Sequence, residues 1–137
     1  MDTPRYLRRV RASAWYDLFA TGAFMTPWTM AWLFDQLGRL SEALGLGKPA
    51  PLLDPAHMLL ANLLGSVVVV WAVLRLRHTR IEHGAYDGAA RGLFALWQIV
   101  AVVQGASPVI LAFTVMELVF GVWQLAPLLR RGPTAPL

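Results

Sequence analysis

Residues 107–129 read SPVILAFTVMELVFGVWQLAPLL, an apolar stretch with one acidic residue, Glu117, near its centre. Ser107 followed by Pro108 is a helix start signal, because proline suits the first helical position, where its missing N–H costs nothing. A helix of this length rises by about 1.5 Å per residue and can cross the roughly 30 Å hydrocarbon core of a bilayer. The sequence therefore predicts a membrane-spanning helix with a carboxyl group near the bilayer midplane.

The composition of the whole chain is typical of a membrane protein. Of its 137 residues, 57% are apolar and 15% are charged, and the mean hydropathy is +0.52. A soluble domain is less apolar and more charged. The length allows one compact bundle, so residues 1–137 are expected to form a single membrane domain. There is no cysteine, which excludes disulfides and thiolate chemistry.

Four spanning helices are predicted, as in an all-α integral membrane four-helix bundle. The first has about 20 residues with tryptophans near both ends, which suits a spanning helix better than the core of a signal peptide. Pro27 is expected to kink it and to free the carbonyl of Ala23. The last two helices should form a tight antiparallel hairpin, because their link is short. The predicted helices are residues 13–34, 56–74, 89–106 and 108–129.

Two longer connections join these helices. Residues 35–55 are rich in proline and glycine and form the predicted outer loop. Within this loop, residues 37–44 fit either a short helix on the membrane surface or a solvated loop. Residues 75–88 form a polar connector, interpreted as solvated. The glycines at the entry to the third helix have the small-xxx-small spacing of close helix packing, although Gly84 is preferably assigned to the loop.

The distribution of Lys and Arg indicates the orientation, because cytoplasmic loops are enriched in both. The N-terminal arm, the segment 75–91 and the C-terminal tail contain ten of them, whereas the outer loop contains Arg39 and Lys48. Both termini are therefore expected in the cytoplasm, in a multi-pass protein of a bacterial inner membrane. The basic rim should attract anionic lipid head groups, and no nucleic-acid partner is expected.

Each predicted helix has one polar or small face, as expected for a bundle with its polar groups turned inward. Gln98 lies at the same depth as Glu117 on the neighbouring helix, and Arg91 is placed to pair with Asp17. These faces predict a polar column from the cytoplasmic rim to the bilayer centre. The candidate ligand-binding or proton-binding residues are Glu117, Gln98, Asn62, Asp17, Gln124 and Trp97.

An acid at the bilayer centre costs about 2.5 to 3.5 kcal/mol, so Glu117 is expected to be protonated at rest. It could exchange a proton with a substrate, bind a cationic ligand when ionised, or donate a hydrogen bond to Gln98. Trp97 is also placed mid-membrane. Core packing is the preferred interpretation for its ring, and a cavity wall is the alternative.

No metal site or cofactor is predicted. His57 is interpreted as a polar anchor at the membrane surface. His78, Glu82 and His83 match no spacing of metal ligands and are assigned to the solvated connector. The sequence has no Gly-rich phosphate loop, no serine elbow and no paired-carboxylate arrangement.

The size and the four-helix topology resemble those of the small DoxX-type bacterial membrane proteins and, more distantly, of the emopamil-binding sterol-isomerase and sigma-2 group. This resemblance covers the architecture alone and transfers no functional residue. Small multidrug transporters also have four helices and a membrane glutamate, but theirs lies in the first helix, whereas Glu117 lies in the fourth.

Three classes of function fit these observations. The preferred one is an accessory or subunit of a membrane complex, because one buried acid without a second catalytic group is thin support for chemistry. The second is a small carrier or binder, in which Glu117 links a proton to a lipophilic or cationic ligand. The third is an enzyme acting on a lipid or isoprenoid, with Glu117 as acid or base and Gln98 and Asn62 orienting the substrate. A homo-oligomer or a complex with another membrane protein is expected.

Overall fold

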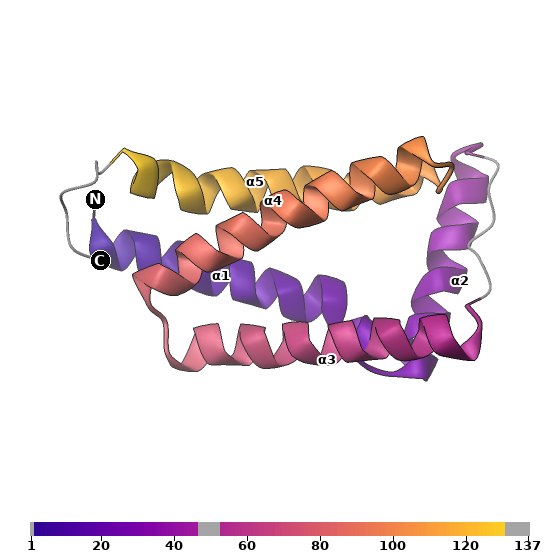
Figure 1. Ribbon diagram of the computed structural model, residues 1–137, viewed down its shortest axis with the longest axis horizontal. Coiled ribbons are helices and arrows are strands. Elements are labelled where there is room, and N and C mark those ends of the chain that lie inside the picture. Colours follow the sequence, from indigo (N-terminus) through magenta and orange to yellow (C-terminus); the bar gives the residue numbers. More distant parts are fainter. Residues whose placement is uncertain (1, 47–52, 131–137) are drawn as a thin grey trace.

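The computed structural model describes residues 2–46 and 53–130, and within them the chain is all-helical, with five α-helices and no strand. The α-helices are α1 (Thr3–Thr21), α2 (Pro27–Ala43), α3 (Pro55–Arg77), α4 (Ile81–Val103) and α5 (Leu111–Leu129), and two short 3₁₀ segments are η1 (Gly22–Met25) and η2 (Pro108–Ile110). Helices α1, α3, α4 and α5 run along the long axis, and α2 crosses one end (Figure 1). The start of α1, the α3–α4 connection and the end of α5 share the opposite end. Lys48 of the predicted outer loop and Arg131 of the tail lie outside the described residues.

The structure divides the predicted first span, residues 13–34, between two helices. The first of them, α1, begins already at Thr3 and therefore includes the basic N-terminal arm. Asp2 caps α1, because its Oδ1 accepts a hydrogen bond from the backbone N–H of Arg5 (3.3 Å). Since α1 ends at Thr21, the arginines of the arm are carried on the same rigid helix as Asp17.

Pro27 ends one helix and starts another instead of kinking a continuous one. It occupies the first turn of α2, and Thr26 is the N-cap. The carbonyl of Ala23 does lack a helical donor, and it accepts a hydrogen bond from Thr29 Oγ1 (2.6 Å). Helix α2 also takes in most of residues 37–44, for which a helix and a loop fitted equally well.

The connection between α3 and α4 is much shorter than the predicted polar connector, residues 75–88. Helix α3 continues to Arg77 and α4 starts at Ile81. Arg75 and Asp87 therefore lie on helices, and both are buried. The interpretation of this stretch as a solvated loop is wrong for these two residues, because each finds charged partners inside the protein.

Helices α4 and α5 form the antiparallel hairpin that the sequence predicted (Figure 1). Gly105 in the link has a φ of +109°, in the region that only glycine occupies easily. Ser107 begins η2 as predicted, with its Oγ accepting a hydrogen bond from the N–H of Val109 (3.4 Å). A single glycine at the turn thus allows the two helices to pack side by side.

Two glycines of the small-xxx-small pattern are sites of close packing. Gly84, which was preferably assigned to a loop, lies in α4, and a Cβ there would be 2.3 Å from Tyr6 Oη. A Cβ at Gly88 would be 2.6 Å from Leu125 Cγ on α5. Gly92 has no neighbouring atom within 4 Å, so it makes no close contact.

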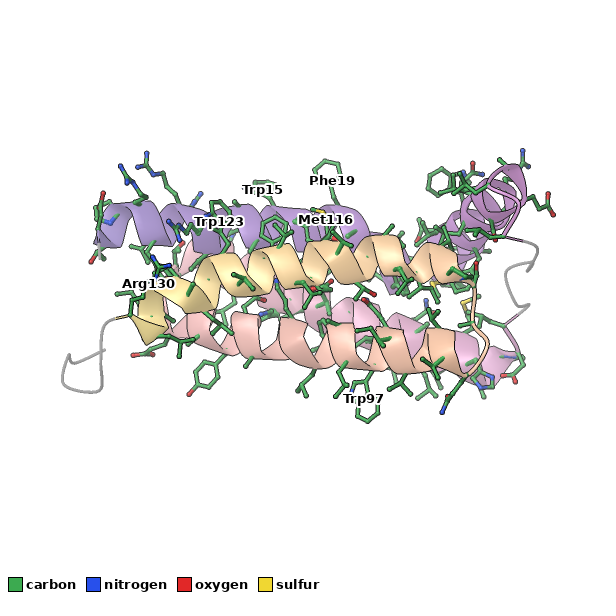
Figure 2. All side chains as sticks on the ribbon, turned by 90° about the horizontal axis from the view of Figure 1, so that it is seen from above. Trp15, Phe19, Trp97, Met116, Trp123 and Arg130 are labelled. Carbon is green, nitrogen blue, oxygen red and sulfur yellow. The ribbon has the colours of Figure 1, made fainter. Side chains whose placement is uncertain are left out.

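The interior of the molecule contains at least as many polar as apolar side chains, and many large apolar side chains lie on its exterior. Among the described residues, nine polar or charged side chains are buried against eight apolar ones. Large apolar side chains lie outside, including Phe19 (85% exposed) and Trp97 (63% exposed), as Figure 2 shows. A soluble protein has the opposite distribution. Two helical segments, Pro55–Arg77 and Pro108–Leu129, are long and apolar enough to cross a membrane.

Helix α3 begins with a charged cap, Asp54. Its Oδ1 accepts a hydrogen bond from His57 N (2.9 Å), and its Oδ2 lies 2.7 Å from His57 Nδ1. The hydrogen bond from the His57 backbone lowers the pKa of Asp54 below its ordinary value of 3.8. The stability that this charge contributes is therefore present above the ordinary pKa and is lost as the pH falls through the lowered one.

Replacing Asp54 with asparagine keeps a good N-cap and removes the charge. We expect the wild type to be the more stable protein near neutral pH, and its advantage to disappear as the pH falls from about 5 through the lowered pKa of Asp54. Reversible unfolding of both proteins in detergent micelles measures this difference. An advantage that stays constant with pH would contradict the assigned role of the Asp54 charge.

Candidate functional site: a buried charge cluster beside a cavity

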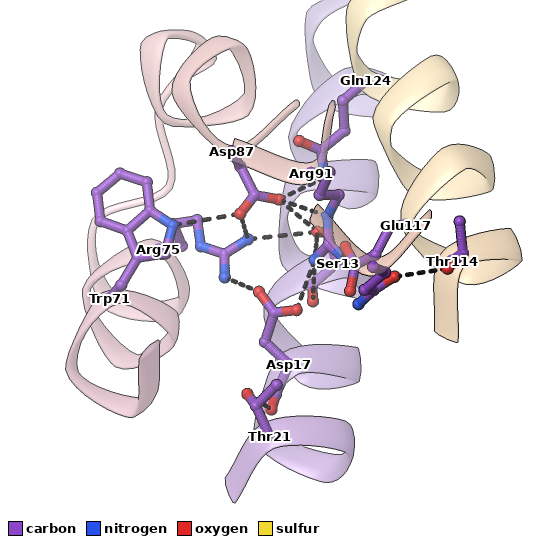
Figure 3. Close-up of polar contacts among 11 residues, drawn as sticks. Ser13, Asp17, Thr21, Trp71, Arg75, Asp87, Arg91, Thr114, Glu117 and Gln124 are labelled. Carbon is purple, nitrogen blue, oxygen red and sulfur yellow. Dashed lines mark hydrogen bonds and ion pairs between the residues drawn. The ribbon is translucent and has the colours of Figure 1, made fainter. Parts of the chain in front are cut away.

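Five charged side chains from four helices meet in the interior (Figure 3). None is more than 7% exposed. We call them the charge cluster: Asp17 on α1, Arg75 on α3, Asp87 and Arg91 on α4, and Glu117 on α5.

Arg91 contacts all three carboxyl groups of the charge cluster. Its Nη1 donates to Glu117 Oε2 (2.6 Å), its Nη2 to Asp17 Oδ1 (2.6 Å) and its Nε to Asp87 Oδ2 (3.1 Å). A guanidinium can do this because it presents five N–H donors in one plane. The predicted pair of Asp17 and Arg91 is confirmed.

Arg75 contacts the two aspartates of the charge cluster. It donates to Asp17 through Nη2, and its Nη1 lies 2.7 Å from Asp87 Oδ1. Trp71, one turn earlier on α3, donates from Nε1 to the same Asp87 oxygen (3.2 Å). Each of the two aspartates therefore bridges both arginines, which ties α1, α3 and α4 together.

Two neutral side chains complete the cluster. Ser13 Oγ donates to Asp87 Oδ2 (2.6 Å) and accepts from Arg91 Nη2 (2.7 Å). Gln124 Nε2 also donates to Asp87 Oδ2 (2.9 Å), so this predicted candidate lies in the cluster. Ser13 was not a predicted candidate, although it lies one turn before Asp17 on the face that was predicted to be polar.

The charge cluster has one more acidic group than basic groups. With every group ionised, two guanidiniums and three carboxylates sum to a charge of −1 (2 − 3). A net charge in a water-poor interior is costly. The cluster therefore favours the uptake of one proton or one cation.

Gln98 lies outside the charge cluster. It accepts a hydrogen bond from Thr114 Oγ1 (2.8 Å), and the expected bond between Gln98 and Glu117 is not formed. Glu117 is bonded to Arg91 instead, because a carboxylate binds a guanidinium more strongly than a neutral amide. Gln98 and Glu117 nevertheless both border the cavity described below.

Asn62 and Trp97 have other positions than predicted. Asn62 Nδ2 donates to the carbonyl of Phe24 (2.8 Å), which lies in η1 where the first helix is interrupted. Asn62 therefore joins α3 to the break and does not belong to the polar column. The ring of Trp97 is largely exposed (Figure 2), so core packing is wrong for it. Trp97 borders the cavity described below, which agrees with the alternative interpretation of a cavity wall.

A cavity of about 330 Å³ lies beside the charge cluster and reaches Glu117. Its polar lining residues are Glu117, Gln98 and Thr21. Glu117 Oε2 faces Arg91, whereas Oε1 accepts no hydrogen bond from any residue in the described ranges. One carboxyl group therefore belongs to both the cluster and the cavity. The apolar lining residues are Phe24, Leu64, Gly65, Val68, Phe94, Trp97, Ala101 and Ile110.

Arg75 and Asp87 are the members that the sequence interpretation missed. The spacing of Asp87 and Arg91, four residues apart, is a helical ion-pair signal that could have extended the third helix toward the N-terminus. Trp71 and Arg75 show the same spacing on the preceding helix. Neither pattern identifies the partner helix, however.

The charge cluster is not a metal site, because its carboxyl groups already bind guanidiniums. Within residues 2–46 and 53–130, no group of three or more His, Cys, Asp or Glu side chains is arranged to hold a metal ion. Comparisons with known protein families, with curated proteins and with solved structures find no match for this chain. Its function must therefore be argued from the site itself.

Proposed function

We propose that this chain is a multi-pass membrane protein that binds a small lipophilic molecule carrying a cationic or hydrogen-bond-donating group. Its apolar exterior and its two long apolar helical segments support a membrane location. In this arrangement α1 and α4 also cross the bilayer, because Asp17 of α1 and Asp87 and Arg91 of α4 are paired inside the charge cluster. The result is a four-helix membrane bundle with α2 across one end.

The positions of arginine and tryptophan support the proposed orientation. Exposed arginines such as Arg77 and Arg80 lie at the end shared by the start of α1 and the end of α5, which the positive-inside rule places in the cytoplasm of a bacterial inner membrane. At the other end, α2 exposes Trp28 and Trp32. Tryptophans in such a position are typical of a helix lying in the membrane interface.

Glu117 is the main support for this proposal, because its carboxyl group belongs both to the charge cluster and to the mostly apolar cavity. The cavity volume of about 330 Å³ is in the range of small-molecule sites, which are mostly apolar with a few polar groups. A donor group of a ligand in the cavity can bind Glu117 Oε1, and a ligand ammonium also offsets the excess negative charge of the charge cluster. A proton on Glu117 offsets the same charge, so ligand and proton compete and binding is linked to pH.

The other two functions have less support. The polar side chains that a subunit would use to contact another chain, such as Asp17 and Gln124, are buried within this one. An enzyme would need a second acid or base, and among the described residues Glu117 is the only ionisable one that borders the cavity. A binder or carrier requires neither feature.

A matched pair of probes tests the proposal: phenylbutylamine, which is cationic, and phenylbutanol, which is nearly the same size and neutral. We expect the wild-type protein in detergent to bind the amine more tightly than the alcohol. The substitution Glu117→Gln should weaken amine binding roughly 30-fold, the equivalent of about 2 kcal/mol for a buried charged hydrogen bond, and should change alcohol binding little. Titration calorimetry measures both affinities.

Glu82→Gln is the matched control, because Glu82 is exposed on the first turn of α4, outside the cavity. It should leave both affinities unchanged. In the wild type, amine affinity should fall on acidification while alcohol affinity stays constant. Equal binding of the two probes, or equal effects of the two substitutions, would refute the proposed role of Glu117.

A further inference from the structure

A second cavity, of about 480 Å³, lies between the start of α1 and the end of α5. Three arginines border it, Arg5, Arg9 and Arg130, and Asp2 is its single acidic residue, so its net charge is +2 (3 − 1). It shares no lining residue with the cavity at Glu117. This basic cavity is therefore a separate candidate site, at the arginine-rich end of the bundle.

Arg9 is positioned in the basic cavity by a proline on the opposite helix. Pro127 lies inside α5, and it has no N–H to donate to the carbonyl four residues earlier, which belongs to Trp123. Arg9 Nη1 donates to this carbonyl instead (2.9 Å), and its guanidinium carbon lies 5.3 Å from the centre of the Trp123 ring. The other N–H groups of Arg9 have no acceptor among the described residues, so they are available to an anion.

An apolar groove continues from the basic cavity along α5. Val122 and Trp123 border both the cavity and the groove. In Figure 2, Arg130, Trp123 and Met116 follow one another along α5, so a basic region leads into an apolar one. A molecule that fills both regions has an anionic head and an apolar tail.

We infer that this surface binds an anionic membrane lipid, with its phosphate in the basic cavity and an acyl chain along α5. The inference rests on the membrane location proposed above, and not on ligand binding at Glu117. Guanidiniums bind phosphate oxygens through paired hydrogen bonds, and basic side chains at the cytoplasmic surface attract anionic lipids. Inorganic phosphate offers the same head-group chemistry without using the groove.

Native mass spectrometry of the full chain in detergent tests this inference, with phosphatidylglycerol and phosphatidylcholine added in equal amounts. The wild type is expected to retain phosphatidylglycerol in preference. Arg9→Gln and Arg130→Gln should each reduce that preference about fivefold. The controls Arg77→Gln and Arg80→Gln remove exposed arginines from the same end but outside the cavity, and they should preserve it.

Arg9→Gln also removes the hydrogen bond to the Trp123 carbonyl, so its effect on lipid binding could come from a change in structure. Arg130→Gln removes a charge from the basic cavity without breaking this bond. Three outcomes would overturn the inference: no lipid preference in the wild type, equal losses in the control variants, or complete displacement of the lipid by inorganic phosphate. The first would show no lipid site, the second a general charge effect, and the third a site for free anions. If one of these outcomes occurs and phenylbutylamine still binds normally, the inference about the lipid fails but the proposed function does not.

Discussion

Replacing Arg91 with glutamine is expected to destabilise the protein by about 3 to 5 kcal/mol, because it leaves buried carboxylates without their partner. Arg91 contacts all three carboxyl groups of the charge cluster, and no other residue in the described ranges does so. Without it, Glu117 has no guanidinium partner, Arg75 alone pairs with Asp17 and Asp87, and the net charge of the charge cluster falls from −1 to −2. Reversible unfolding in mixed detergent micelles measures the loss, which should shrink at low pH as the carboxylates become protonated.

Two further substitutions make this result specific. Arg77→Gln removes an exposed arginine near the end of α3 and should change stability by less than about 0.5 kcal/mol. Glu117→Gln leaves two carboxylates with two guanidiniums, so it should cost far less than Arg91→Gln. If Arg91→Gln and Glu117→Gln cost the same, the cluster would not depend on its charge balance.

Replacing Gly65 with alanine is the second substitution with a large expected effect. A Cβ at this position would lie 2.5 Å from the carbonyl carbon of Phe24 and 2.7 Å from the backbone nitrogen of Met25. Backbone atoms cannot move aside as the end of a side chain can, so α3 would have to separate from η1. We expect a loss of about 1 to 3 kcal/mol, even though alanine by itself favours a helix over glycine by about 1 kcal/mol.

Gly92→Ala is the matched control, since this glycine also lies within a helix but has no atom within 4 Å of the added Cβ. It should stabilise the protein by roughly 0.5 to 1 kcal/mol, through helix propensity alone. The same unfolding assay compares the two variants. Stabilisation by both substitutions would show that α3 does not approach η1 as closely as described.

Much of the helical architecture could be predicted from local signals. The long apolar stretches of α3 and α5 predict two helices without any knowledge of their neighbours. The short link at Gly105 predicts that α4 packs against α5. The common depth of Asp17 and Arg91 along their helices was also sufficient to predict that they pair. These predictions depend on spacing along one helix, or on two helices joined by a short turn.

The helix boundaries near charged residues could not be predicted in this way. Charged residues next to an apolar stretch usually mark its solvated end, so Arg75 and Asp87 were assigned to a connector. The structure buries both, because Arg75 pairs with Asp17 of α1 and with Asp87 of α4. The effect of Pro27 could not be predicted either, because a proline can kink a helix or end it. In the structure the helix is broken there, and α2 packs across the end of the bundle.

The sequence by itself determined that the chain is helical, that two helical segments are long and apolar enough to cross a membrane, and that Glu117 is an acid in an apolar setting. Only the tertiary structure decided what that acid contacts. A carboxyl group in an apolar helix takes the strongest donor that reaches it, and which donor does so depends on the rotation and spacing of neighbouring helices. Here Arg91 binds one oxygen of Glu117 and the cavity lies beside the same carboxyl group. The spacing of residues along a single helix contains no information about that contact.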